Sequence, residues 1–166
     1  MQNMLQFWAQ IVDIKCIEGY TSYFTARRKR DLIATTFQEI TIEWWENALP
    51  NFEPFISQVV LDEIERGDSD AAKMRCETAK NFKLIEVTEE TVNLAEIYFK
   101  VLEIPDKAKA DAFHMAISVL GGVDYLVTWN CTHIASARVR KAIGNINEDR
   151  GLVTPVICTP EELMEP

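Results

Sequence analysis

Short apolar segments alternate with amphipathic segments along this chain, and this alternation constrains the fold more than any other feature of the sequence. The apolar segments have the length of strands, and the segments between them carry apolar residues at helical spacing. The strand-like segments are residues 11–17, PFIS at 54–57, KLIEV at 83–87, DYLVTW at 124–129 and PVICT at 155–159. This order predicts an α/β fold with an open, mostly parallel sheet and helices on both of its faces.

The segments between the strands carry recognisable helix signals. Apolar residues at helical spacing predict a long amphipathic helix over 31–49. Thr88 predicts the N-cap of a helix that ends before Pro105, and Thr159–Glu162 has the pattern of a capping box. The segment 107–120 is apolar on most sides, so we expect this helix in the middle of the fold.

The length of 166 residues suits a single domain over residues 1–166. Lys and Arg number 17 and Asp and Glu number 26, which gives a net charge of −9. This balance excludes a protein that holds nucleic acid by bulk charge, but it is compatible with a nuclease, because a site for divalent metal must itself be acidic. Four cysteines without a CxxC pair predict free thiols in a reducing cytosol. The sequence has no apolar run of about 20 residues and no signal-peptide pattern at its start, so we expect a cytoplasmic protein.

Polar residues follow the predicted strands, at the sheet edge where open α/β folds bind their ligands. Glu18 follows the first strand, Glu63 lies on the helix after PFIS, and Asn130 ends the strand DYLVTW. Asp111 lies in the first turns of an otherwise apolar helix. Burying a lone carboxylate is costly unless it is paired, hydrogen-bonded or bound to a cation, so Asp111 is either a helix cap or a metal ligand. The chain has no glycine-rich phosphate loop and no GxSxG elbow, which leaves the carboxylates as its candidate chemistry.

Four segments carry a resemblance to a known family: FISQVVLDEIERGD, KAKADAFHMAISV, DYLVTWNCTHIASARVR and the closing PVICTPEEL. They resemble the PIN-domain family, in particular the VapC-type toxin nucleases of bacterial toxin–antitoxin systems and their stand-alone relatives. The resemblance runs from about Glu18 to the C-terminus and leaves residues 1–10 as an N-terminal extension. It implies a three-layer α/β/α sandwich and a ribonuclease that hydrolyses RNA phosphodiester bonds with Mg²⁺ or Mn²⁺.

The resemblance also assigns the site, residue by residue. Glu63 matches the second acid of the family and Asp111 the third, while Asn130 stands where many members have a fourth acid. Glu18 lies in the region of the first acid, and an alternative register makes Asp13 that acid. The expected catalytic residues are therefore Glu18, Glu63, Asp111 and Asn130, of which Glu18, Glu63 and Asp111 would hold the metal.

Basic residues and histidines near these positions have two interpretations each. The runs Arg27–Arg30 and Arg138–Lys141 are either solvated surface or contacts for RNA phosphates. His114 lies one turn beyond Asp111, where a core histidine is favoured over a ligand, and His133 is expected to help fix the loop after Asn130.

Three functions are compatible with the sequence. The first is an active metal-dependent endoribonuclease of the toxin type, with RNA as substrate and, from the resemblance, an antitoxin partner and a homodimeric state. The second is a catalytically degenerate PIN scaffold that binds RNA or an antitoxin without cleavage. The third is an unrelated doubly wound domain whose acids are surface and capping residues. No membrane association is expected.

Overall fold

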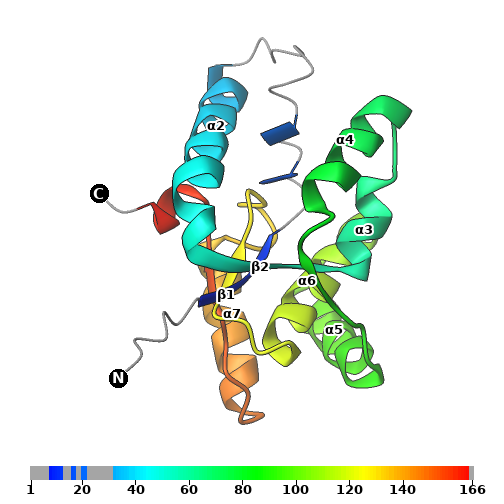
Figure 1. The fold of residues 1–166 in the computed structure, drawn as a ribbon. Helices are drawn as coiled ribbons and strands as arrows, with labels where there is room; N and C mark the ends of the chain where they lie inside the picture. The colour runs from blue at the N-terminus through cyan, green and yellow to red at the C-terminus, as the bar shows by residue number, and fades with distance from the viewer. Residues whose placement is uncertain (1–7, 13–15, 18–19, 22–31, 165–166) are drawn as a thin grey trace, which may run out of the picture.

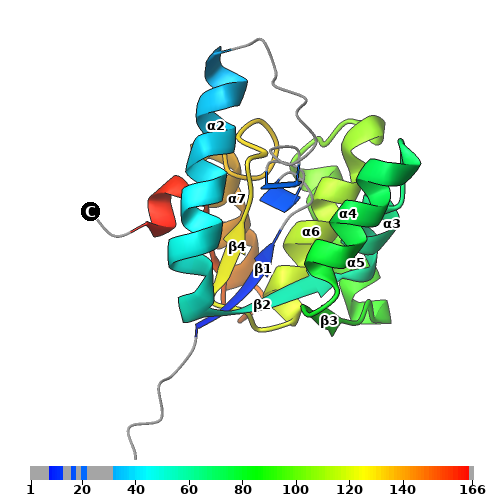
Figure 2. The same ribbon diagram turned by 45° about the horizontal axis from the view of Figure 1, so that its top comes forward.

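The computed structural model of the protein describes residues 8–12, 16–17, 20–21 and 32–164. Within these residues, five strands form one sheet in the order β3-β2-β1-β4-β5, and every neighbouring pair is parallel. The strands are β1 (Trp8–Val12), β2 (Phe52–Ser57), β3 (Lys83–Ile85), β4 (Tyr125–Val127) and β5 (Val156–Cys158). Figures 1 and 2 show the helices arranged around this sheet. The α/β fold with a parallel sheet is confirmed.

Helices connect the strands much as the sequence predicts. They are α2 (Leu32–Glu43), α3 (Gln58–Ile64), α4 (Ser69–Ala79), α5 (Glu89–Val101), α6 (Lys109–Leu120) and α7 (Ala137–Glu148). A π-helical turn (Trp44–Ala48) continues α2, so the predicted long helix changes its winding near its end. Thr88 caps α5, and Thr159 and Glu162 exchange the hydrogen bonds of a capping box, both as predicted. Among the residues described here, no helix is long and apolar enough to cross a membrane.

The sheet is covered on both faces, which makes the sandwich three-layered. Leu126 and Ile157 belong to one apolar cluster, together with side chains of α5, α6 and α7. Their chain neighbours Val127 and Cys158 belong to a second cluster, which includes Trp44 and side chains of α3. Successive side chains of a strand point to opposite faces, so the two clusters lie on opposite sides of the sheet. Helix α6 contributes an almost continuous buried segment to the first cluster, as expected for a central helix.

The first strand differs from the predicted one. The sequence predicts a strand over 11–17, whereas β1 ends at Val12 and Cys16 and Ile17 are helical. Both of these residues are fully buried, so the apolar run itself is correctly identified. A short apolar run fits a buried strand or a buried helical turn equally well, and periodicity alone does not separate the two. Pairing with β2 and β4 on its two sides sets the position of the strand.

The strand order places a switch point beside β1. From β1 the chain moves outward through β2 to β3, and it then returns to the other side of β1 to form β4 and β5. In an open parallel sheet, the connections after two neighbouring strands can leave in opposite directions. A crevice then forms at the carboxyl ends of these two strands, and ligands bind there. The carboxyl ends of β1 and β4 therefore define where a ligand site is expected.

Candidate functional site

Glu63 is placed beside this edge by a short helix that follows β2 directly. Ser57, the last residue of β2, is buried and caps α3, because its Oγ accepts a hydrogen bond from the backbone N–H of Val60 at 3.3 Å. Glu63 lies in the last turn of this helix. Its Oε2 atom is 3.2 Å from Nε2 of His114, which belongs to α6. The tertiary structure therefore brings a carboxylate and an imidazole into contact, although the two residues are 51 positions apart in sequence.

Helix α6 carries the second part of the site. Asp111 is in its first turn and is partly buried, and His114 follows three positions later. Residues three apart are neighbours on a helix surface, so Asp111 lies near His114 along α6, while the contact that the structure records with Glu63 is made by His114. His114 is 3% exposed, which agrees with the predicted core histidine, but its contact with Glu63 makes it part of the candidate site as well.

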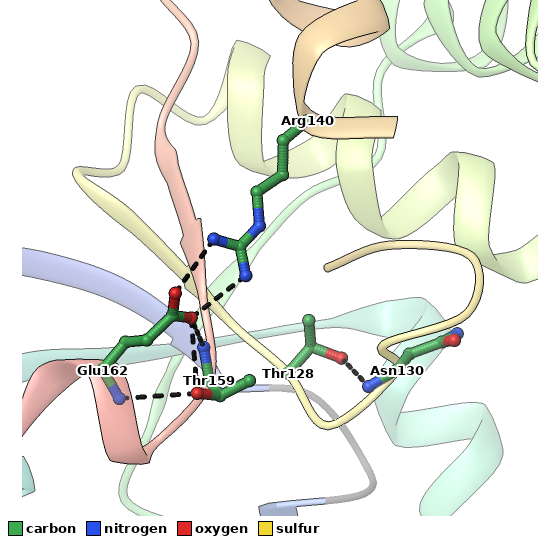
Figure 3. Close-up of polar contacts among 5 residues, drawn as sticks. All are labelled: Thr128, Asn130, Arg140, Thr159 and Glu162. Carbon is green, nitrogen blue, oxygen red and sulfur yellow. Dashed lines mark hydrogen bonds and ion pairs between the residues drawn. The ribbon is translucent and has the colours of Figure 1, made fainter. Parts of the chain in front are cut away.

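The turn after β4 positions Asn130. The Thr128 Oγ accepts a hydrogen bond from the backbone N–H of Asn130 at 2.9 Å (Figure 3). The Asn130 side-chain oxygen accepts another from the backbone N–H of His133 at 3.1 Å. Asn130 is buried, and its amide closes the turn that it begins. His133 thus takes part in fixing the loop after Asn130, through its backbone, as the sequence predicts.

Arg140 and Glu162 form a bidentate ion pair near the carboxyl end of β5. Nη1 and Nη2 of Arg140 each donate to a carboxylate oxygen of Glu162 at 3.0 Å (Figure 3). The Arg140 guanidinium holds the pKa of the Glu162 carboxyl below its usual range, and the same contact raises the pKa of Arg140. Arg140 belongs to the predicted basic run on α7, and it lies partly exposed at the surface with Glu162 as its partner. The capping box predicts the position of Glu162, but a partner 22 residues away leaves no local signal.

Trp129 connects this edge of the sheet to α2. Its indole Nε1 donates to the Thr41 Oγ at 2.7 Å, and its ring stacks on Phe37 with centroids 4.4 Å apart. Phe37 is therefore a packing partner of the turn that holds Asn130. The local sequence carries no signal for this contact, because it joins residues 88 positions apart.

The remaining predicted residues are distributed differently. Glu18, the alternative Asp13 and the run Arg27–Arg30 lie outside the described residues. Helix α7 carries Arg138, which lines a cavity of about 300 Å³ together with His133 and residues at the end of α5. The four cysteines all lie in the described part of the chain and none of them forms a disulfide there, as predicted.

The oxygen ligands that the structure describes suit a hard divalent cation. The Glu63 Oε2 atom is buried and accepts no hydrogen bond from the described part of the chain, and the His114 Nε2 atom lies 3.2 Å from it. Carboxylate oxygens such as those of Glu63 and Asp111 are what Mg²⁺ and Mn²⁺ bind in proteins. No group of three acidic, histidine or cysteine side chains with metal-binding geometry occurs among the described residues, and both candidates for the first acid, Glu18 and Asp13, fall outside them.

Comparisons with known proteins add a distant structural likeness. No protein-family model matches the sequence, and no curated protein matches it significantly. The chain is similar in fold to a chain in the crystal structure of VapBC2 from Rickettsia felis bound to a DNA fragment from their promoter. The similarity covers 91% of this chain and 98% of the other, with 11% identity and a TM-score of 0.48. A likeness at this level assigns neither a family nor an activity.

Proposed function

We propose that this protein is a metal-dependent endoribonuclease of the PIN type, related to the toxin nucleases of VapC-type pairs. The observation that carries the proposal is the contact between Glu63 and His114 at the edge of a parallel sheet with a switch point beside β1. This contact brings two of the residue segments on which the family resemblance depends, 55–68 and 107–119, into one site. The acidic net charge and the oxygen-rich donors support a cation-dependent reaction.

In the proposed site, the acids of the chain bind the cation and the surrounding residues orient them. Glu63 and Asp111, with one acid near the first strand, would hold Mg²⁺ or Mn²⁺. A bound cation of this kind lowers the pKa of a water molecule and neutralises charge at the scissile phosphate. Asn130 holds the turn after β4 in place, since its side-chain oxygen accepts the backbone N–H of His133.

The first acid has two candidates, and the course of β1 bears on the choice. The sequence analysis favours Glu18, whereas Asp13 is the alternative. Because β1 ends at Val12, Asp13 is the next residue in the chain, and the helical residues Cys16 and Ile17 come before Glu18. We therefore include both positions in the experiment, as Asp13→Asn and Glu18→Gln, and the variant that loses metal binding identifies the ligand.

The deciding experiment is RNA cleavage by the purified protein with Mn²⁺, with EDTA, and with the Asp111→Asn variant. We expect cleavage that requires Mn²⁺ and whose rate falls at least about 100-fold in Asp111→Asn. Mutating residues that only support the ligands of a metal site already lowers metal affinity or activity about 10–100-fold, and loss of a ligand should lower it more. Asp106→Asn is the matched control, since Asp106 is exposed in the short turn before α6 and its loss should leave the rate unchanged.

Three other results would each change the conclusion. Cleavage by Asp111→Asn at the wild-type rate would show that the site is wrongly assigned. Absence of cleavage, with Mn²⁺ still raising the melting temperature, would identify a degenerate PIN scaffold that binds without cutting, because a ligand of the folded state alone raises stability. Absence of both effects would favour an unrelated doubly wound domain.

The resemblance further leads us to propose a cytoplasmic homodimer with an antitoxin partner. Sizing of the purified protein by light scattering checks the dimer, and a mass of one chain would contradict it. The antitoxin proposal is checked by co-purification with the product of a neighbouring gene.

A further inference from the structure

Arg75 of α4 is a buried cation whose described hydrogen bonds all go to backbone carbonyls. It is 8% exposed. Its Nε and Nη2 atoms donate to the carbonyl oxygen of Ile64 at 3.1 and 2.8 Å, and Nη2 also donates to the carbonyl oxygen of Arg66 at 2.6 Å. Burying a guanidinium is costly unless its donors are satisfied, so a buried arginine with these partners is fixed tightly in place.

The carbonyls that Arg75 binds belong to the end of α3 and the turn after it. The last four carbonyls of a helix have no partner within the helix, and a cation near them is stabilised by the helix dipole. Helix α3 has seven residues, a length at which a helix in water does not hold its shape without tertiary contacts. Ser57 holds its first turn and Arg75 holds its last, so both ends of α3 are fixed from outside.

Glu63 lies in the last turn of α3, the end of the helix that Arg75 binds. Ile64 follows Glu63 directly, and a planar peptide bond keeps their Cα atoms about 3.8 Å apart. Holding the Ile64 carbonyl therefore fixes the backbone from which the Glu63 side chain extends toward His114. Figures 1 and 2 show α4 lying beside α3, and α3 also contacts α6, so this short helix joins the element that carries Arg75 to the element that carries His114.

We propose that Arg75 is a positioning residue for the candidate metal site, which it serves by fixing the last turn of α3 and hence the carboxylate of Glu63. The proposal rests on the proposed function of Glu63 as a metal ligand. Arg75 itself does not touch the site, because its described donors are engaged with backbone oxygens. Ligand groups must be held within about 0.5 Å to bind productively, and a short helix with a loose last turn does not provide this.

The experiment measures the Mn²⁺ dissociation constant of the full chain by titration calorimetry, below the melting temperature of every variant. We expect Arg75→Met to weaken Mn²⁺ binding about 10–100-fold, the range for residues that orient metal ligands. Arg75→Lys keeps the charge and a donor group, so it should retain part of the Mn²⁺ affinity. It replaces Arg75→Met in the experiment if Arg75→Met does not fold. Combining Arg75→Met with Glu63→Gln should weaken binding no further than Glu63→Gln alone.

Arg150 supplies a control. It donates from Nη1 to the carbonyl oxygen of Ile146 at 3.0 Å near the end of α7, but it is exposed and makes one such described bond, where buried Arg75 makes three. Arg150→Met should leave Mn²⁺ affinity unchanged, which separates the position of Arg75 beside α3 from the loss of any arginine that binds a helix end.

The outcomes distinguish this inference from the proposed function. If wild type does not bind Mn²⁺, or Glu63→Gln binds it as tightly as wild type, the proposed site is wrong and the inference fails with it. If Glu63→Gln loses binding but folded Arg75→Met or Arg75→Lys binds like wild type, the metal site stands and the role of Arg75 is disproved. Equal losses of affinity in Arg75→Met and Arg150→Met would also disprove it.

Discussion

Asn130 and Arg140 are both polar residues at the carboxyl edge of the sheet, and the structure gives both of them partners within the protein. The Asn130 oxygen closes a turn with His133, and the Arg140 guanidinium binds Glu162. A polar residue that follows a strand thus serves the fold before it serves any ligand. Of the residues proposed from the sequence and described in the structure, Glu63 and Asp111 remain the candidates whose oxygens suit a cation.

Glu103 illustrates backbone strain at a single residue. It follows α5 with a φ of 52°, in the left-handed region that favours glycine over residues with a side chain. Replacing it as Glu103→Gly should relieve this strain and raise the free energy of unfolding by about 0.5–1 kcal/mol. Urea unfolding checks the value. Lys100→Gly, within α5, should lower stability by a similar amount, and a loss of stability in Glu103→Gly would contradict the interpretation.

Among the helices, α5 shows most directly how a local sequence signal determines where an element begins. Thr88 accepts a hydrogen bond from the backbone N–H of Thr91, and the Thr91 hydroxyl accepts one from the backbone N–H of Thr88. Glu89 and Glu90 follow in the first turn, where the helix dipole favours negative charge. All these contacts join residues within three positions, so the sequence alone predicts them.

Loss of this cap should destabilise the protein without affecting the candidate site. We expect Thr88→Ala to lower the free energy of unfolding by about 1 kcal/mol, the usual contribution of an N-cap side chain. Thr36→Ala is the control, because the Thr36 hydroxyl bonds to the Leu32 carbonyl within exposed α2 and caps nothing. Its effect should stay within about 0.5 kcal/mol. Chemical denaturation measures both, and equal effects would show that the cap contributes no stability.

For the molecule as a whole, burial determines how stability depends on pH. Burial raises the pKa of Tyr98 and of the Cys158 thiol, each to about 12. Tyr98 donates a hydrogen bond to the side-chain oxygen of Asn147, and Asn147 donates to Thr154 at 2.8 Å. These contacts join α5, α7 and the segment before β5, so ionisation of Tyr98 would leave a buried charge where three parts of the fold meet.

The protein should therefore lose stability at alkaline pH. A group whose folded pKa is raised stabilises the fold fully below its unfolded pKa, and that stability is lost as pH rises toward the folded pKa. For Cys158 the loss begins near pH 9 and for Tyr98 near pH 10, and it continues toward pH 12 at about 1.4 kcal/mol per pH unit for each group. Urea midpoints between pH 7 and 11 check this. Cys158→Ala and Tyr98→Phe should each flatten the decline, and an unchanged slope in both would contradict the assignment.

The sequence by itself determined the alternation of strands and helices, the capping residues and the central position of α6, because these depend on burial patterns and on contacts within a few residues. It also supplied Glu63 and Asp111 as candidate ligands, since an acid on the helix after a strand and an acid in an otherwise apolar helix are both visible in the local sequence. Only the tertiary structure decided that Glu63 meets His114, that Arg75 binds the end of α3, that Arg140 is occupied by Glu162 and that β1 ends at Val12. Contacts of this kind depend on how whole elements pack and pair, and the periodicity of an apolar pattern says which face of an element is buried without saying which partner covers it.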